Sequence, residues 1–471
     1  MKNKIYIMIC LFLSSGLASC NDWLDVEPKT QETLDEMFSK QQGYQDVLIG
    51  SYLKFKSDNL YGKHMTFGNI EFLAQHWEWT KDAVSDELSH YNYKGKNSES
   101  AMSSIFETSY KVVAELNMML QNMEEDRGVF EKGMYEIIKG EALAMRAFCH
   151  FDLLRLFGPM PTNVSGKTVL PYVKKATLEY HEHLPYQQYI ENLEQDMKDA
   201  EVLLKETDPI VNKARTAGLT VAASDFLKDR QLRFNYYAVK AMQARFYLWV
   251  GGEANNSKAF ACAKEVLDAV DEHKKPKYSL ASVDAISNDD FSFSSEHILA
   301  LHDYKLYEKA KNNFTGDVVF RQNPSLIKTD LYTAGTTDIR LTLWTEEVAA
   351  NQSRYFTVQK YIQPEKEGNN QIPLIRLSEM YFIAMECGSL DDANTLYKEF
   401  CIQRDITPVR IESKDQLMAI LLDEYNKEFY GEGQMFYTYK RLAVENILWS
   451  TDEGNEDVYV VPLPKNEVSY N

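Results

Sequence analysis

The chain has 471 residues, which is long enough to bury a large hydrophobic core and excludes a small disulfide-stapled scaffold. Its 51 Lys and Arg residues stand against 70 Asp and Glu residues, so the formal net charge is −19 and nucleic acid is excluded as an expected partner. With 44% hydrophobic and 26% charged residues, the composition is that of a folded globular protein. Aromatic residues make up 12% of the chain, more than we expect a core to need.

Residues 1–19 have the pattern of an export signal. Lys2 and Lys4 precede an apolar run that is much shorter than the roughly 20 residues a membrane helix needs. The run is followed by Leu-Ala-Ser-Cys, ending at Cys20, which resembles the lipobox of bacterial lipoproteins. We therefore expect Cys20 to carry a lipid anchor, whose several acyl chains would hold the protein stably at the membrane. An ordinary secretory signal with a coincidental cysteine is the alternative.

The strongest helical pattern runs from Tyr135 to Phe157. Ala142, Met145 and Cys149 recur at spacings of three and four, which is the stripe of a buried helix face, and phenylalanines form a second apolar edge. A helix that is apolar on two sides is expected to lie between other helices. Gly158 and the proline after it are expected to end this helix.

Further helical segments come in pairs. The pattern predicts helices over Tyr236–Val250 and Lys258–Val270, then over Leu374–Glu386 and Asp391–Arg404, with another over Asp415–Tyr430. Alanine-rich helix pairs near the scale of about 34 residues are typical of tetratricopeptide solenoids. The sequence thus predicts a mainly α-helical, single body over residues 20–471 with imperfect tetratricopeptide-like helix pairs, at about residues 30–58, 105–157, 187–206, 234–270 and 373–430.

Long polar and aromatic segments without helical periodicity separate these helices. The two longest cover about residues 59–104 and 271–372, and long loops of this kind are usually functional. We predict that they form the ligand-binding face. Short strands are expected at His297–Leu301 and Tyr355–Gln359.

Four cysteines of the predicted mature body lack a close CxxC spacing and lie in helical segments. They are Cys149, Cys262, Cys387 and Cys401. Buried free thiols are the favoured interpretation, with a Cys387–Cys401 disulfide as the alternative if their helices are antiparallel neighbours.

Two polar segments contain residue types that bind metal ions. His181 and His183 have the spacing of half a metal site, and the acidic run at 452–457 has the oxygen ligands that calcium prefers. Solvated loops are the favoured interpretation for both, so we expect no cofactor or metal.

A resemblance to a known family is carried mainly by residues 140–161. The segments GEA at 140–142, RAF at 146–148 and FDLLRLFG at 151–158, with Pro161, resemble the signature helix of the SusD/RagB family. These are surface lipoproteins of Bacteroidetes-type bacteria that bind nutrients beside a TonB-dependent transporter. Other motifs resemble the family in the same order, namely DWLD at 22–25, Gly50 with Tyr52, DAVSDEL at 82–88, residues 238–250, EHIL at 296–299, DIR at 338–340 and IRLSEMY at 375–381.

The C-terminal part departs from the family pattern. Glu399 and Ile402 stand where the family commonly has Asn and Arg, while Arg404 is kept. After Glu-Gly-Gln at 432–434, Met435 stands where an Arg is expected, and Thr438 replaces an Asp. These departures weaken the expectation of C-terminal ion pairs and indicate a divergent member.

The resemblance implies a binding protein rather than an enzyme. It implies a lipid-anchored protein of the outer membrane, at the cell surface, that captures a glycan or oligosaccharide and delivers it to a SusC-like TonB-dependent transporter. A peptide-binding, RagB-like protein is the first alternative. A lipid-anchored glycoside hydrolase is the second, although the common one-line motifs for acyl transfer, nucleotide chemistry and zinc hydrolysis are absent from the sequence.

A glycan-binding surface needs exposed aromatic rings, which stack on the apolar face of a sugar, beside polar side chains that bind its hydroxyls. The two long segments supply such residues. For Trp77 and Trp79 a place in the core is the alternative, and residues such as Phe314 and Trp344 are more often packing residues. The predicted ligand-binding residues are Trp77, Trp79, Tyr91, Tyr93, Asp303, Tyr304, Tyr307 and Trp344.

Overall fold

The computed structural model describes residues 33–78, 83–123, 127–215, 225–315, 320–348, 352–362 and 370–468. The predicted lipid-anchor residue Cys20 and the predicted ligand residue Trp79 lie outside these ranges. The helices are α2 Leu34–Phe38, α3 Gln41–Phe55, α4 Asn69–Leu73, α5 Ala83–Ser89, α6 Lys96–Met123, α7 Met134–Phe157, α8 Tyr186–Thr207, α9 Tyr236–Val250, α10 Glu253–Leu267, α11 Val283–Ser287, α12 Leu306–Phe314, α13 Pro324–Leu326, α14 Leu377–Cys387, α15 Leu390–Arg404, α16 Lys414–Glu428, α17 Met435–Leu442, α18 Glu456–Tyr459 and α19 Lys465–Val468. The strands are β1 His297–His302, β2 Trp344–Val348, β3 Arg354–Val358 and β4 Gln371–Arg376.

Helix α7 lies between other helices, as its two apolar edges predicted. It packs against α6 on one side and α8 on the other, and nearly all of its side chains are buried. A Cβ at Gly140 would lie 2.7 Å from Leu204 Cγ of α8, so the glycine permits this close contact. The helix ends at Gly158, where the buried ammonium of Lys440 donates to the carbonyl oxygens of Leu156 (3.1 Å) and Gly158 (2.7 Å).

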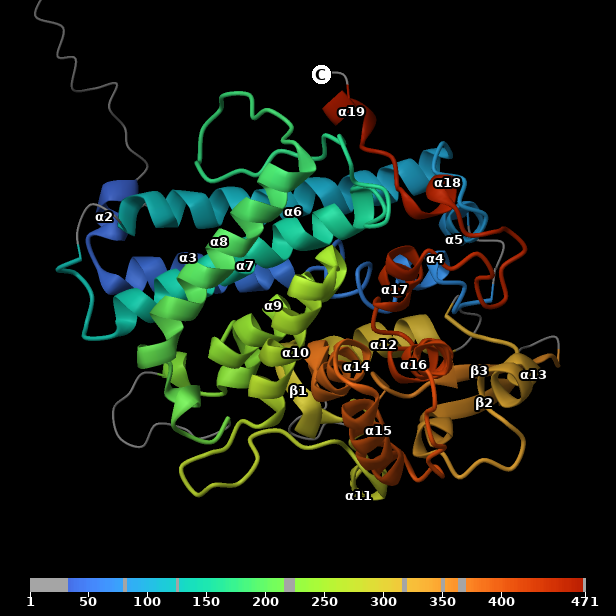
Figure 1. Cartoon of the computed structure of the whole chain (residues 1–471). Coiled ribbons are helices and arrows are strands. Elements are labelled where there is room, and N and C mark those ends of the chain that lie inside the picture. The colour runs from blue at the N-terminus through green and yellow to red at the C-terminus, as the bar shows by residue number, and fades with distance from the viewer. Residues whose placement is uncertain are drawn as a thin grey trace, which may run out of the picture.

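The helices continue as a stack of neighbours. After α6, α7 and α8, helix α8 packs on α9, α9 on α10, α10 on α14 and α14 on α15 (Figure 1). The predicted mainly helical fold of helix pairs is confirmed, and the strands are few and short. Helix α19 returns to the N-terminal half, where Lys465 pairs with Glu99 of α6 at 2.9 Å.

Two small antiparallel sheets join the helices. Strand β1 pairs with β4, with Ala300 opposite Pro373, and β2 pairs with β3, with Glu346 opposite Phe356. Both strands predicted from the sequence are present, with bounds shifted by one residue. Because β4 leads directly into α14, the β1–β4 pair connects the segment that contains β1 to the C-terminal helices.

The prediction of a long loop over residues 59–104 is wrong. This segment contains α4, α5 and the start of α6, and its residues Met65, Phe67 and Ile70 are almost completely buried. Tight turns satisfy the backbone between residues 57 and 68, so apolar side chains enter the core without helical periodicity. Similarly, the segment 271–372 contains helices α11 to α13 and three strands.

A buried ionic cluster joins the C-terminal elements. The carboxylate of Glu428, at the end of α16, accepts hydrogen bonds from Arg376 (2.7 Å), Arg404 (2.6 and 3.0 Å) and Arg340 (3.1 Å). Burial alone would raise the pKa of Glu428, but Arg404 and Arg376 lower it well below its usual value, so the carboxylate stays charged. C-terminal ion pairs thus form although Met435 replaces the expected Arg.

A second buried contact ties α4 to the turn after α16. The carboxylate of Glu71 accepts hydrogen bonds from the backbone amides of Gly431 (2.9 Å) and Gly433 (2.6 Å). Both glycines have positive φ, 75° and 69°, which favours glycine at these positions. The motif Glu-Gly-Gln at 432–434 therefore has a structural role in closing the body.

The favoured prediction of free thiols is confirmed. Cys149, Cys262, Cys387 and Cys401 are all unpaired, and three of them are buried, so the alternative Cys387–Cys401 disulfide is contradicted. His183 hydrogen-bonds through Nε2 to Glu467 Oε1 of α19 at 2.8 Å. Within the described ranges, no group of three or more His, Cys, Asp or Glu side chains is placed to hold a metal ion.

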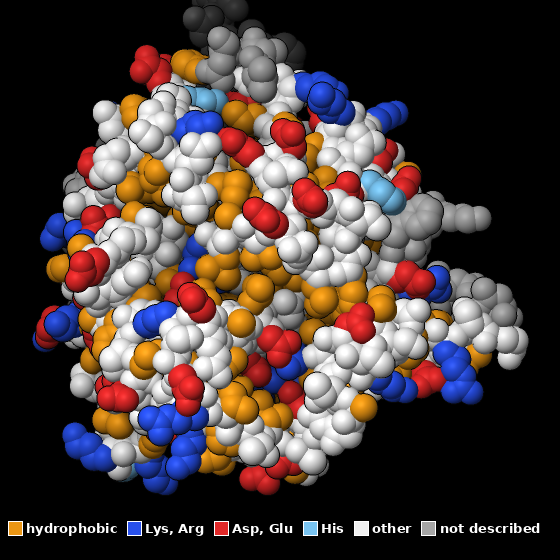
Figure 2. All heavy atoms as spheres, turned by 45° about the vertical axis from the view of Figure 1, so that its right-hand side comes forward, with side chains coloured by type: hydrophobic (Ala, Val, Ile, Leu, Met, Phe, Trp, Pro, Cys, Tyr) orange, Lys and Arg blue, Asp and Glu red, His pale blue; other side chains and the backbone are white. Residues whose placement is uncertain are grey.

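The surface carries charges of both signs. On the face shown in Figure 2, hydrophobic side chains gather in a band across the middle, with acidic and basic side chains around it. No helix of the described segments is long and apolar enough to cross a bilayer.

Buried His150 of α7 predicts a pH-dependent stability. Burial, and then Arg146 nearby, lower the pKa of His150 to about 3. The unfolded chain therefore binds a proton that the folded chain does not, and stability falls as the pH drops from about 6.5 toward 3. We expect His150→Gln to reduce the slope of unfolding free energy against pH in this window by up to about 1.4 kcal/mol per pH unit. Urea unfolding at a series of pH values measures it, and an unchanged slope would contradict the assignment.

Candidate functional site

The structure separates the predicted aromatic residues into buried and exposed ones. Trp77 is 2% exposed, and its indole N–H donates to the carbonyl oxygen of Phe67 at 2.8 Å. Trp344 is also buried, with its ring against Tyr430. Their burial contradicts the prediction that they face a ligand, and the core alternative is correct for Trp77. A large aromatic ring removes much apolar surface from water when it is buried, so it favours the core even when its sequence neighbours are polar.

Tyr91 and Tyr93 hold loops rather than present a flat surface. The hydroxyl of buried Tyr93 donates to the Val458 carbonyl oxygen at 2.6 Å, and that of half-buried Tyr91 donates to the Leu73 carbonyl oxygen at 3.2 Å. Tyr93 is therefore removed from the predicted ligand surface, and the hydroxyl of Tyr91 is already engaged.

Among the predicted ligand residues that the structure describes, Tyr304 is the one whose side chain is strongly exposed. Its side chain is 67% exposed, and the ammonium groups of Lys56 and Lys305 lie 5.7 and 5.5 Å from the centre of its ring. An exposed phenol ring flanked by cations offers one apolar face and nearby hydrogen-bond donors. Tyr307, on the first turn of α12, is half-buried.

Asp303 positions this ring instead of facing a ligand. Its buried carboxylate accepts hydrogen bonds from the Lys305 amide (3.1 Å) and from Lys309 (2.8 Å), which also pairs with Asp58 at 2.7 Å. Burial alone would raise the pKa of Asp303, but the Lys309 and Lys305 hydrogen bonds lower it below its usual value. The carboxylate thus fixes the turn that carries Tyr304, which corrects its predicted role as a ligand contact.

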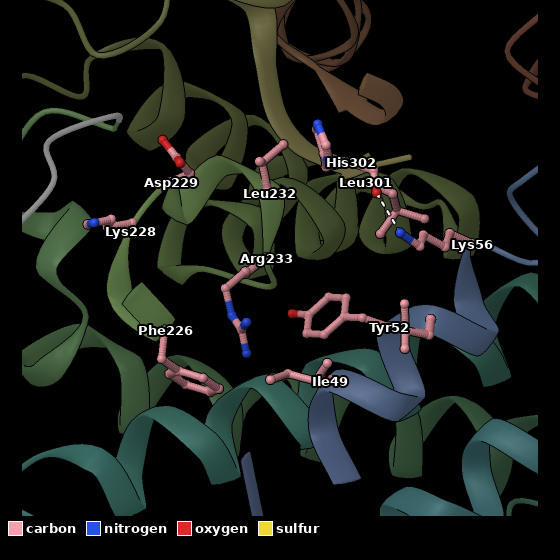
Figure 3. A pocket seen from close by; sticks show the side chains of 11 residues that line it. Ile49, Tyr52, Lys56, Phe226, Lys228, Asp229, Leu232, Arg233, Leu301 and His302 are labelled. Carbon is pink, nitrogen blue, oxygen red and sulfur yellow. Dashed lines mark hydrogen bonds between the residues drawn. The ribbon is translucent and has the colours of Figure 1, made fainter. Parts of the chain in front are cut away.

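A cavity of about 510 Å³ adjoins this ring, within the size range of small-molecule sites. It lies between α3, the turn segment before α9 and the end of β1 (Figure 3). Lys56 belongs both to its wall and to the surroundings of Tyr304. The lining residues are Ile49, Tyr52, Leu53, Lys56, Phe226, Lys228, Asp229, Leu232, Arg233, Leu301 and His302.

Arg233 forms one wall of the cavity between two aromatic rings. Its guanidinium carbon lies 3.9 Å from the ring centre of Phe226 and 4.9 Å from that of Tyr52. Figure 3 shows the Arg233 side chain between these two rings. The Arg233 Nε also pairs with Glu141 at 3.0 Å. This sandwich fixes the orientation of a side chain that is otherwise flexible.

Glu141 supports this wall from behind. Fully buried on α7, it accepts hydrogen bonds from Tyr52 (2.9 Å), Arg233 and Arg230, and Arg230 in turn binds Asp208 through two hydrogen bonds of 2.9 Å. Burial, and then Glu141, raise the pKa of Tyr52 well above its usual value, so the phenol stays protonated and donates. A residue of the signature helix therefore holds the cavity wall in place.

The rim combines apolar and polar groups. Ile49 and Leu53, one turn apart on α3, are 39% and 55% exposed. The Lys56 ammonium donates to the carbonyl oxygen of His302 at 3.0 Å. Burial, and then Lys56, lower the pKa of His302, so its imidazole is neutral at pH 7 and can both donate and accept hydrogen bonds.

Sequence reasoning missed most of this cavity. Lys56, Phe226, Arg233 and His302 come from separate segments, and the fold alone brings them together. The one signal was on α3, where Ile49 and Leu53 place apolar side chains outside the buried stripe. Two exposed apolar side chains four residues apart on a helix form an apolar patch, and such a patch indicates a binding surface.

Two other cavities are alternative candidates for the binding site. One of about 590 Å³ lies between α6, α7 and α8, and its lining residues include three lysines and no aromatic residue. Another of about 380 Å³ includes Tyr278, which is buried, and half-buried Tyr381. The cavity beside Tyr304 is favoured because the ammonium of Lys56, which lines it, lies 5.7 Å from the centre of a strongly exposed ring.

Comparison with known proteins agrees with this architecture. Residues 22–248 match the model of a family described as SusD-like, starch-binding and associating with the outer membrane. SusD-like protein P25 from Formosa agariphila is 20% identical over 163 residues, which cover 33% of this chain and 30% of that protein. Over residues 22–248 the chain is therefore similar to the SusD-like family. This similarity confirms the resemblance carried by residues 140–161, which lie within the matched segment.

Solved structures show that the SusD-like fold extends over nearly the whole chain. A SusD superfamily protein from Bacteroides thetaiotaomicron superposes with a TM-score of 0.71 at 21% identity, covering 92% of this chain and 98% of that one. A SusD-like carbohydrate binding protein from Bacteroides vulgatus gives a TM-score of 0.70 at 15% identity, covering 92% and 96%. At these identities the likeness concerns the fold.

Proposed function

We propose that this SusD-like protein is a lipid-anchored protein of the outer-membrane surface, which binds a nutrient glycan and delivers it to a SusC-like TonB-dependent transporter. The family description, starch-binding and associating with the outer membrane, supports the ligand class and the location. The lipobox that ends at Cys20 supports the anchor.

The observation that carries the proposal is the exposed ring of Tyr304 beside a lined cavity. A sugar ring stacks on the phenol, and adjoining units enter the cavity, where Tyr52 and Phe226 supply aromatic surface. Lys56 and His302 supply hydrogen-bonding groups for hydroxyls. Capture of this kind makes and breaks no bond, so it needs no cofactor.

The cavity favours binding over hydrolysis. Glycoside hydrolysis ordinarily uses two carboxyl groups that flank the scissile bond. Among the described residues that line the cavity, Asp229 carries the single carboxylate, because Glu141 lies behind the wall and is engaged by two arginines.

Calorimetry with a panel of oligosaccharides tests the proposal. Tyr304→Ala is expected to weaken binding of the confirmed ligand by about tenfold or more, because stacking is lost. Tyr180→Ala, at a tyrosine that is 56% exposed elsewhere, serves as the control and is expected to bind normally. Unchanged binding by the Tyr304 variant, binding of peptides instead of glycans, or turnover of a polysaccharide would each contradict the proposal.

A further inference from the structure

The cavity beside Tyr304 is cationic although the chain as a whole carries a net charge of −19. Lys56, Lys228 and Arg233 line it, against Asp229 alone among the lining carboxylates of the described residues. Charges separated by more than about 8 Å are largely screened at physiological ionic strength. The groups in the cavity wall therefore decide which ligands it attracts.

Lys56 keeps binding capacity for a ligand. Its ammonium donates to one backbone carbonyl oxygen, that of His302, and it takes part in no ion pair among the described residues. Neighbouring Lys309 differs, since Asp58 and Asp303 both neutralise it. A lysine ammonium has three donors, so Lys56 has two left for an acceptor in the cavity.

Arg233 also has an unsatisfied donor. Its Nη2 is buried and has no hydrogen-bond partner, while its Nε is bound to Glu141. The carboxylate of Glu141 is shared with Arg230 and Tyr52, so it neutralises Arg233 only in part. A buried donor without a partner is costly, and the residue that carries it lines the cavity.

We propose that the glycan bound in this cavity is anionic, carrying a uronate carboxylate or a sulfate ester that pairs with Lys56 and Arg233. A neighbouring sugar ring stacks on Tyr304. The inference rests on the proposed glycan-binding function and specifies its ligand class. A neutral glycan would leave the Lys56 ammonium without an acidic partner, whereas an oxyanion uses the charge and the donors of both residues.

Calorimetry with matched pairs of oligosaccharides tests the inference and shows whether the anionic group is a uronate carboxylate or a sulfate ester. One pair is oligogalacturonate and its methyl ester, and the other is a sulfated carrageenan oligosaccharide and its desulfated form. The charged member of one pair is expected to bind about tenfold more tightly than its neutral counterpart, because charge-assisted hydrogen bonds are the stronger ones. Its affinity, unlike that of the neutral form, is expected to fall as salt is added.

Lys56→Gln is expected to lower the affinity for the charged ligand by about tenfold, to about the affinity for its neutral counterpart. Lys414→Gln is the control, because Lys414, which is more exposed than half-buried Lys56, also donates to backbone carbonyl oxygens, those of Glu386 and Gly388. Its binding is expected to stay unchanged. Far-ultraviolet circular dichroism and the urea midpoint verify that both variants fold.

Three outcomes would overturn the inference. The first is equal affinity for the charged and neutral members of both pairs, and the second is unchanged binding by Lys56→Gln. The third is tight binding of neutral maltooligosaccharides that Tyr304→Ala abolishes and Lys56→Gln does not affect, which would leave the proposed function standing. A failure of the whole panel to bind would overturn the proposed function together with the inference.

Discussion

Replacing Glu428 by glutamine is expected to lower the free energy of unfolding by about 3–5 kcal/mol. Its carboxylate binds three buried arginines, Arg340, Arg376 and Arg404, which come from three different parts of the chain. Glutamine keeps the size of the side chain but removes the negative charge, so the three guanidinium groups repel one another in a medium of low dielectric. Urea unfolding followed by fluorescence measures the loss.

Glu346→Gln provides the control for this experiment. Glu346 also has two cationic partners, Lys328 (3.3 Å) and Arg354 (2.7 Å), but this ion pair lies at the surface. Water and salt screen exposed pairs, so the unfolding midpoint is expected to change little. If the Glu428 and Glu346 variants unfolded at the same urea concentration, the buried cluster would not have the stabilising role described above.

Gly433→Ala is expected to destabilise the protein by about 3 kcal/mol, from two causes. A Cβ at this position would lie 2.1 Å from the carbonyl oxygen of Met65, so the backbone must move. The φ of 69° adds the strain of a left-handed conformation. The same movement would break the hydrogen bond from the Gly433 amide to Glu71, which ties α4 to the turn after α16.

Gly431→Ala separates the two causes. Gly431 has a similar φ of 75° and also donates its amide to Glu71, but a Cβ there meets only ordinary contacts of 3.8 Å or more. It is expected to cost about 1 kcal/mol, the strain alone. Thermal or urea unfolding of the two variants gives the comparison, and equal losses would show that the clash with Met65 has been relieved at no cost.

Helices with strong periodicity could be predicted from the sequence. The expected bounds of α7 differ from the observed ones by one residue and those of α9 agree, because spacing, alanine content and terminal glycines are all local signals. The helix after β4 was predicted to begin at Leu374, three residues early, because the apolar run of β4 continues into the helix without a break.

The packing of irregular segments could not be predicted in the same way. Residues 59–74 mix polar and apolar side chains without a regular period, and a series of turns places Met65 and Phe67 in the core. Trp77 shows the same limit, because whether a ring points inward depends on neighbours such as Phe314 and Phe320, which are distant in the sequence.

Part of the candidate site could be predicted from the sequence. Tyr304 was predicted because its segment is too polar for the core, and it is exposed. The cavity beside it was not predicted, since Lys56, Phe226 and Arg233 meet only through tertiary structure. A buried carboxylate on α7, Glu141, positions the wall, and no local pattern indicates such a contact.

A crystal structure of the protein with the tightest-binding oligosaccharide of the panel tests the proposed glycan-binding site most directly. We expect electron density for a sugar ring stacked on Tyr304, with adjoining units extending into the cavity between α3 and the end of β1. A ligand bound elsewhere, with the Tyr304 ring still facing solvent and the cavity without sugar, would contradict the proposed site.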